Sequence, residues 1–105
     1  MKKLFLVTRR DLAPGARASQ LCHALRAFVE SHPEVDRSWY EESNTLVLLE
    51  VDDEDALMRL AWRATMTGVP WSMFREPDMN DAATALALGP SGQPLVRRLP
   101  LALSV

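Results

Sequence analysis

Two side chains that could take part in catalysis, Gln20 and His23, lie close together in the stretch RASQLCHALRAF, residues 17–28. Apolar residues recur here every three or four positions, which predicts a helix with one buried stripe. Gln20 and His23 are three residues apart, so on a helix both fall on a polar flank beside that stripe. His23 therefore either lines a pocket or is a partly buried helix residue with a local hydrogen bond.

A second group of reactive side chains lies in the segment REPDMND, residues 75–81. It contains Glu76, Asp78 and Asp81, and Thr84 opens the run that follows. Loops at strand ends often carry catalytic groups, because a rigid scaffold holds them at an open edge. The alternative is turn chemistry, since Pro-Asp and Asn-Asp stabilise turns through their short side chains. Both interpretations stay open for this segment.

The single cysteine and the two histidines argue against a disulfide or a structural metal site. Cys22, His23 and His32 do not stand in a CxxC or HxxxH spacing. Cys22 falls within the apolar stripe, which predicts a small core residue. On a helix it points about 100° away from His23, so the two cannot act together as nucleophile and base. No GxGxxG or GxxxxGK[ST] motif is present, which excludes nucleotide binding through those loops.

The elements that must position these residues alternate between strand and helix. Apolar and β-branched runs predict strands, and apolar residues three and four apart predict helices. The predicted strands are residues 4–8, 45–51, 69–74 and 84–90, the predicted helices are 15–31 and 52–68, and a helical turn is predicted at 94–99. The continuous apolar run at 45–51 predicts a central strand, and Pro70 favours an edge position for 69–74. The order β-α-β-α-β-β predicts an α/β fold with helices against a sheet of mixed direction.

Length and composition fit one globular domain over residues 1–105. Of these residues 48% are hydrophobic and 25% are charged, which is enough for one modest core. The apolar run in MKKLFLV is too short for a signal peptide or a membrane span, which predicts a cytoplasmic protein that does not enter a membrane.

The charge pattern limits the kind of partner. A net charge of −2 argues against a surface that coats nucleic acid. Basic residues gather at the two ends of the chain, however, and they form a local patch if both ends meet on one face. The three tryptophans, Trp39, Trp62 and Trp71, are expected to pack rather than to stack on bases.

Four motifs together resemble the type II peptidyl-tRNA hydrolases of archaea and eukaryotes. They are LFLVTRRDL, ASQLCHA, NTLVLLEV and TALALGP, in the family's order and over most of the chain. The matching residues are Arg10-Asp11-Leu12, Gly15, Ala18-Ser19, Gln20, His23-Ala24, Asp78, Thr84 and Leu88-Gly89-Pro90. The resemblance implies a four-stranded mixed sheet, often in a homodimer, that cleaves the ester between a peptide and tRNA without a cofactor.

The resemblance also implies roles for individual residues. Ester hydrolysis needs an activated water and a group that stabilises the developing oxyanion. The implied catalytic residues are Asp78 and Thr84, which act on the water, and His23 and Gln20, which position the acceptor end. The residues implied in holding tRNA phosphates are Arg9, Arg10, Arg17, Arg97 and Arg98.

Two departures from the family pattern support other hypotheses. The family's lysine falls in GAR, where this chain has Ala16 or Arg17, and a guanidinium does not act as a base. The loop before Thr84 is shortened to MNDAA and lacks the family's usual glycine, arginine and threonine. The main alternative is a binding module on the same scaffold that holds tRNA, another RNA or a protein without turnover. A third hypothesis is a small-ligand or structural domain.

Overall fold

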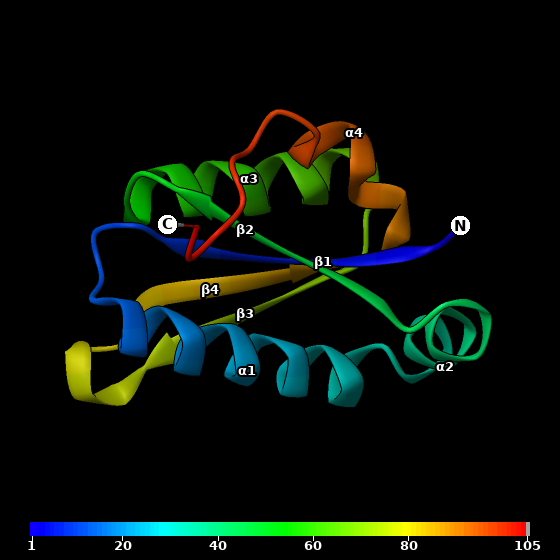
Figure 1. The fold of residues 1–105 in the computed structure, drawn as a ribbon, viewed down its shortest axis with the longest axis horizontal. Coiled ribbons are helices and arrows are strands. Elements are labelled where there is room, and N and C mark those ends of the chain that lie inside the picture. The colour runs from blue at the N-terminus through cyan, green and yellow to red at the C-terminus, as the bar shows by residue number, and fades with distance from the viewer. Residues whose placement is uncertain (105) are drawn as a thin grey trace.

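Four strands form one mixed sheet with helices on both faces (Figure 1). The structure is a computed structural model and describes residues 1–104. The strands are β1 Lys3–Arg9, β2 Thr45–Val51, β3 Trp71–Glu76 and β4 Ala82–Leu88, in the spatial order β2-β1-β4-β3. β1 runs parallel to β2 and antiparallel to β4, and β3 runs antiparallel to β4. The predicted α/β fold and its order of strands and helices are confirmed.

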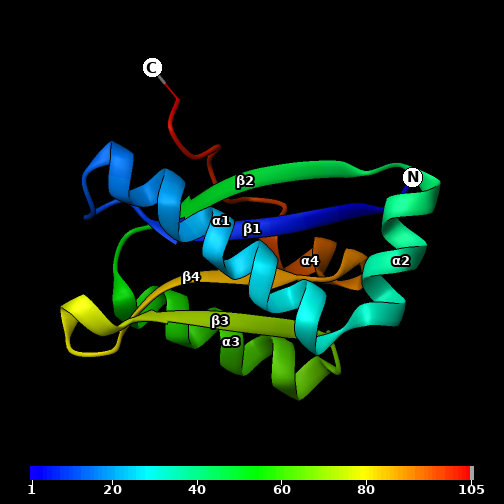
Figure 2. The ribbon, with the colours of Figure 1, turned by 90° about the horizontal axis from the view of Figure 1, so that it is seen from below.

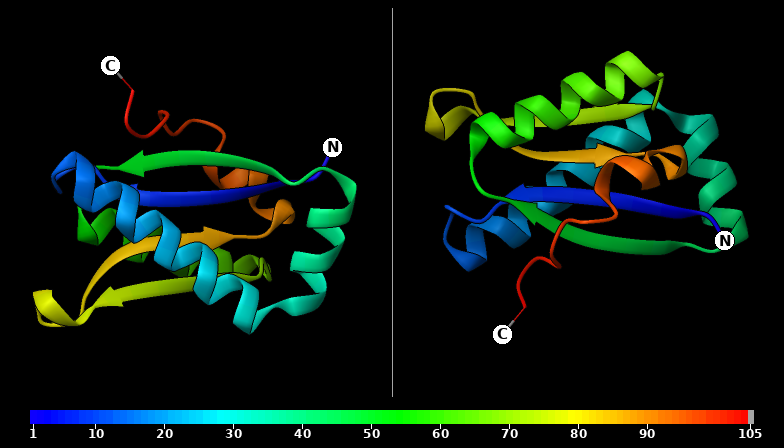
Figure 3. Two further views of the ribbon diagram at one scale, coloured as in Figure 1. Left: turned by 60° about the horizontal axis from the view of Figure 1, so that its bottom comes forward. Right: turned by 90° about the horizontal axis from the view of Figure 1, so that it is seen from above.

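Each face of the sheet buries its own apolar core beneath a layer of helices. The helices are α1 Pro14–Ser31, α2 Pro33–Glu42, α3 Glu54–Thr67 and α4 Gln93–Val96, with 3-10 turns at Pro77–Met79 and Pro90–Gly92. α1 crosses one face over a core that includes Leu6 and Phe28 (Figure 2). α3 and α4 cover the other face over a core that includes Phe5 and Leu57 (Figure 3). Alternate residues of β1 therefore serve opposite layers, as the twofold repeat of a strand requires.

α3 begins and ends at residues whose side chains or conformations suit a helix terminus. The side chain of Asp53 accepts a hydrogen bond from the Ala56 backbone N–H at 2.9 Å, which satisfies one free donor of the first turn. Gly68 closes the helix in the left-handed conformation at φ 74°, which glycine adopts without a steric penalty. Both ends lie where the sequence predicts them.

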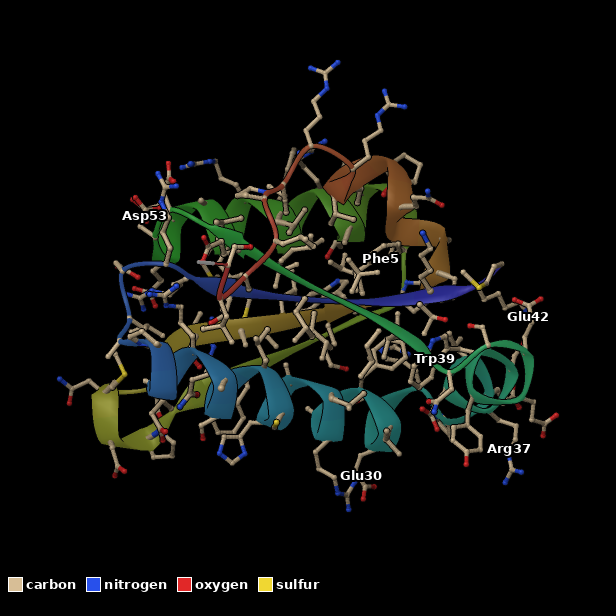
Figure 4. The ribbon with its side chains drawn as sticks, viewed as in Figure 1. Phe5, Glu30, Arg37, Trp39, Glu42 and Asp53 are labelled. Atoms are coloured by element: carbon tan, nitrogen blue, oxygen red, sulfur yellow. The ribbon has the colours of Figure 1, made fainter. Side chains whose placement is uncertain are left out.

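α2 is a helix that the periodicity argument does not assign. Pro33 does end α1, as expected, but proline also fits the first position of a helix, where its missing N–H costs nothing. Glu34 and Asp36 then lie in the first turn, where acidic side chains are favourable. Trp39 points from α2 into the α1-side core (Figure 4), and its indole N–H donates to the Thr45 carbonyl at 2.7 Å.

β2 lies at an edge of the sheet, so the prediction of a central strand at 45–51 is wrong. A continuous apolar run does not report neighbours on both sides of a strand, and in β2 only Leu49 and Val51 are buried. The free side of β2 is partly covered by residues 100–102. The Glu50 N–H donates to the Pro100 carbonyl at 3.1 Å, and the Ala102 N–H donates to the Leu48 carbonyl at 2.8 Å. β3 occupies the other edge, as Pro70 indicates.

The hairpin between β3 and β4 is tighter than the sequence indicates. Arg75 and Glu76 pair with Ala83 and Ala82, so both belong to the sheet and the connection shrinks to residues 77–81. Asn80 and Asp81 take positive φ values of 55° and 58°, which asparagine and aspartate tolerate better than most residues. Glu76 is thus fixed at the end of a strand rather than in a loop. None of the helices in residues 1–104 is long and apolar enough to cross a membrane.

Candidate active site

Thr84 owes its position to an irregularity in β4. Phe74 pairs with Ala85 while Arg75 pairs with Ala83, so Thr84 is the extra residue of a β-bulge. Leu86 belongs to the α3-side core and Ala85 to the α1-side core, so alternation continued back along β4 would send Thr84 toward α3. The bulge turns the Thr84 side chain toward α1 instead, because a bulge places two successive residues opposite a single partner residue.

A chain of hydrogen bonds joins Thr84 to α1 and to the end of β3. The Thr84 hydroxyl donates to Gln20 Oε1 at 2.7 Å, and Gln20 Nε2 donates to Glu76 Oε1 at 3.0 Å. Thr84 is fully buried and Gln20 is 5% exposed. Buried polar groups need such partners, since an unpaired one costs on the order of 1–3 kcal/mol. We call this set, Thr84, Gln20 and Glu76, the Thr84–Glu76 network.

The frame around the network is also hydrogen-bonded. The Thr8 hydroxyl donates to the Thr84 carbonyl at 2.8 Å, which holds the bulge against β1. The backbone N–H of Ala83 donates to Glu54 Oε2 at 2.7 Å, and the Ala83 carbonyl accepts from Arg9 Nη1 at 3.0 Å. Side chains from α3 and β1 thus satisfy the backbone groups beside the bulge. Thr84 is therefore held in place by its backbone as well as by Gln20.

Glu76 is the residue that the sequence argument undervalues. It is half-buried at the end of β3, with Oε1 held by Gln20 and Oε2 accepting from the Asp78 N–H at 3.5 Å. Asp78, the predicted catalytic carboxylate, lies one turn further on in Pro77–Met79 and is exposed. Its backbone joins the network, whereas no hydrogen bond or ion pair of its side chain occurs within residues 1–104. The sequence signal for Glu76 was its presence among the carboxylates of REPDMND.

His23 and Cys22 lie on the outer side of α1. The His23 ring stacks on the Phe74 ring with centroids 4.4 Å apart and an interplanar angle of 19°. Phe74 precedes the bulge, so His23 borders the network without a hydrogen bond to it. Cys22 is exposed, so the expectation of a core cysteine is wrong. The buried stripe of α1 runs through Leu21 and Ala24 and leaves Cys22 at its margin.

The three arginines near the start of the chain are each held by a carboxylate. The Arg9 guanidinium donates two hydrogen bonds to Asp11, from Nε to Oδ1 at 3.0 Å and from Nη2 to Oδ2 at 2.9 Å. This side-chain hydrogen bond from Arg9 lowers the pKa of Asp11 and raises the pKa of Arg9. The Arg10 guanidinium pairs with Asp52 at 2.7 Å, and both side chains are exposed.

Arg17, which stands near the family's lysine position, turns toward β2. Its Nη1 lies 3.1 Å from Glu50 Oε2, and its Nε donates to the Leu12 carbonyl at 2.7 Å. Gln20 contacts β4 and β3, on the other side of β1. Arg17 is therefore not brought together with the Thr84–Glu76 network.

Arg97 and Arg98 follow α4 on the opposite face of the sheet. Both are exposed, and they line a groove with Arg63 of α3. The structure thus gathers Gln20, Thr84 and the Asp78 turn, with His23 and Arg9 at the border, and leaves Arg97 and Arg98 apart. Among residues 1–104, no cluster of three or more His, Cys, Asp or Glu side chains is placed to hold a metal ion.

The Thr84–Glu76 network thus joins a hydroxyl, an amide and a carboxylate at one end of a small α/β sheet. Thr84 and Gln20 are buried, so the half-buried Glu76 carboxylate is the member of the network that can meet a water and accept a proton from it. The sequence profile of the family Peptidyl-tRNA hydrolase PTH2 matches residues 2–104. The chain belongs to this family.

Individual relatives agree with the family assignment. A peptidyl-tRNA hydrolase of Thermococcus sibiricus is 28% identical, with 92% of this chain and 91% of the relative covered. A peptidyl-tRNA hydrolase of Thermococcus onnurineus is 29% identical over the same shares. Among solved structures, a protein of unknown function from Agrobacterium tumefaciens superposes with a TM-score of 0.71 at 14% identity. It covers 95% of this chain, its own chain is covered over 96%, and the likeness shows a shared fold.

Proposed function

We propose that this protein hydrolyses the ester that joins a peptide or blocked amino acid to tRNA. The observation that carries the proposal is the Thr84–Glu76 network, in which a buried amide aligns a hydroxyl and a carboxylate. Membership of the family and the names of its relatives supply the substrate class. The network supplies a group that such a reaction needs, a base held in a fixed position.

The proposed step assigns one task to each member of the network. Glu76 takes a proton from a water as the water oxygen attacks the ester carbonyl carbon, and the buried Thr84 hydroxyl anchors Gln20, which holds the carboxylate. The bond between that carbon and the ribose oxygen then breaks. Glu76 returns the proton to the ribose oxygen, so a free peptide acid and deacylated tRNA leave. Gln20 fixes the distance between hydroxyl and carboxylate and is a positioning residue.

Phosphates of the acceptor end need a cation that can change partners. Arg9 and Arg17 are held by carboxylates with largely buried guanidinium groups, whereas the Arg10 and Asp52 side chains are 56% and 70% exposed. An exposed ion pair contributes roughly 0–1 kcal/mol, so Arg10 can exchange Asp52 for a phosphate at little cost. We assign phosphate contact at this end to Arg10, and we assign Arg9 and Arg17 to holding the frame.

The test compares the two carboxylates of the hairpin. Release of a labelled N-blocked aminoacyl group from tRNA is measured at low salt for wild type, Glu76→Gln and Asp78→Asn, which keep size and remove one charge each. We expect Glu76→Gln to lower the rate by about 10²- to 10⁴-fold, the usual contribution of a general base. We expect Asp78→Asn to stay within about fivefold of wild type, since its side chain is exposed beside the network.

Each other result has a defined meaning. A loss confined to Asp78→Asn returns the base to Asp78, the residue that the sequence predicts. No release by folded wild-type protein contradicts the hydrolase and favours the binding module on the same scaffold. The homodimer that the resemblance implies and the cytoplasmic location that the short apolar run in MKKLFLV predicts stay predictions, which sedimentation velocity and cell fractionation check.

A further inference from the structure

The face covered by α3 and α4 carries a basic surface separate from the Thr84–Glu76 network. Three adjoining grooves of about 300, 250 and 270 Å³ share lining residues such as Leu99, and none is lined by an acidic residue. Lys3 of β1 and Arg97, which follows α4, line the same groove. We call this set the arginine surface; it comprises Lys3, Arg59, Arg63, Arg97 and Arg98.

Most of the charge of this surface lies away from the acidic residues that make the whole chain negative; Arg59 is the exception, because Asp55 precedes it by one turn of α3. Residues 56–75 and 82–104 contain no aspartate or glutamate, although the chain has a net charge of −2. Within residues 1–104, none of the four arginines of the surface forms an ion pair. The paired arginines are all elsewhere: Arg9, Arg10, Arg17, Arg26 and Arg37. Unneutralised cations on one face create a local potential that attracts polyanions even when the total charge is negative.

We infer that the arginine surface binds the phosphate backbone of RNA. Guanidinium groups hold phosphate oxygens with a planar fork, and arginines spaced along two helices match a ligand with repeated charges. Trp62 of α3 is 64% exposed and does not belong to the core, so its packing at an interface stays a prediction.

This surface lies across the sheet from the Thr84–Glu76 network, so it contacts RNA away from the ester (Figure 3). Its role is to add affinity through phosphates, which weakens steeply as salt rises. The identity of that RNA as tRNA rests on the proposed function. Binding itself does not, because deacylated tRNA carries no ester and its affinity can be measured whether or not the protein is a hydrolase.

The experiment measures binding of deacylated tRNA over a range of salt concentrations for two double variants. Arg97→Ala/Arg98→Ala removes two unpaired charges of the arginine surface. Arg26→Ala/Arg37→Ala removes the same charge from exposed ion pairs on α1 and α2. Arg37 and Glu30, the partner of Arg26, lie on the α1 side of the sheet, far from α4 (Figure 4). All four positions are exposed, so both proteins are expected to stay folded.

We expect the Arg97→Ala/Arg98→Ala variant to lose on the order of tenfold in affinity at low salt, and its slope of log K against log salt to flatten by about two. The control variant is expected to keep the wild-type affinity and slope within about twofold. Equal weakening of both variants shows a general charge effect and overturns the inference. Unchanged binding by the Arg97→Ala/Arg98→Ala variant overturns it as well.

Discussion

The polar side chains on the two faces of the sheet differ in whether they have partners within the protein. On the α1 face, Thr84, Gln20 and Glu76 bond to one another, and the arginines at that end of the sheet are paired with carboxylates. On the α3–α4 face, Arg63, Arg97 and Arg98 line open grooves without an acidic neighbour among the residues that line them. One face fixes the geometry of a few atoms, and the other presents charge to solvent.

This difference separates two requirements of a protein that acts on a polyanion. Orienting a water requires groups whose positions are over-determined, because misplacement by about 1 Å can cost on the order of 100-fold in rate. Attracting a nucleic acid requires charge that is not already neutralised, and its geometry can be loose. The bulge at Thr84 serves the first requirement, and the absence of acidic residues near α4 serves the second.

Among the substitutions that test the difference between the two faces, Gln20→Ala is expected to have the largest effect. We expect Gln20→Ala to lower the rate of ester cleavage at saturating tRNA by about 100-fold or more, since the Thr84 hydroxyl and Glu76 lose the group that aligns them. Its affinity for deacylated tRNA is expected to stay near wild type. Ser19→Ala, at the exposed neighbouring position, is the control. A variant that loses affinity and keeps its rate would make the α1 face a binding face and remove the distinction.

Arg17 tests whether arginines on the network side are structural. We expect Arg17→Met to lower the free energy of unfolding by about 1–3 kcal/mol, because it leaves the Glu50 carboxylate, in a side chain only 14% exposed, and the Leu12 carbonyl without their donor. Arg26→Met removes an exposed pair and is expected to cost at most about 0.5 kcal/mol. Urea denaturation measures both. Equal losses would show that burial does not set the two pairs apart.

His23 gives a smaller effect that separates stacking from proton transfer. We expect His23→Ala to lower the free energy of unfolding by about 0.5–1.5 kcal/mol, because the ring stacks on Phe74 at 4.4 Å. His23→Phe keeps an aromatic ring and is expected to retain both stability and most of the cleavage rate. A Phe variant as slow as the Ala variant would assign the histidine a chemical role and extend the network to the surface of α1.

The order of the elements and the residues of the first helix could be predicted from the sequence. Features that depend on contacts between distant parts of the chain could not. Gln20 is predicted because helix spacing and the resemblance agree on it. The edge position of β2 is not predicted because the hydropathy of a strand does not show whether it has hydrogen-bonded neighbours on one side or on two. α2 is not predicted because Pro33 is interpreted only as the end of the helix before it, whereas it is also the first residue of the next helix.

The candidate site shows the same limit at finer scale. Glu76 and Asp78 are both carboxylates in REPDMND, and their sequence positions do not show which one faces α1. That choice depends on β3 continuing to Glu76 and on the bulge at Thr84, and both depend on pairing with β4. The pairing of Arg10 and Arg17 with acids was equally hidden, since their partners Asp52 and Glu50 come from the loop after β2 and from β2 itself.

The pair of Arg9 and Asp11 gives the smallest expected effect, and it sharpens the contrast between paired and unpaired arginines. The hydrogen bond from Arg9 lowers the pKa of Asp11 in the folded protein, so the ionised carboxylate stabilises the fold. This stabilisation is complete above the unfolded pKa of about 3.9 and is lost as pH falls through the lower folded value. Because Asp11 is 42% exposed, we expect Asp11→Asn to cost only about 0.5 kcal/mol at pH 7.

Chemical denaturation of wild type and Asp11→Asn at pH 7 and below pH 3 checks this expectation. The difference in the free energy of unfolding is expected to shrink at the lower pH, since the wild-type carboxylate is then protonated and no longer attracts Arg9. Arg98→Ala, on the arginine surface, is expected to show no loss at either pH, because no carboxylate among residues 1–104 pairs with it. An acid-sensitive loss in Arg98→Ala would mean that this surface is neutralised within the protein and is not free to bind phosphates.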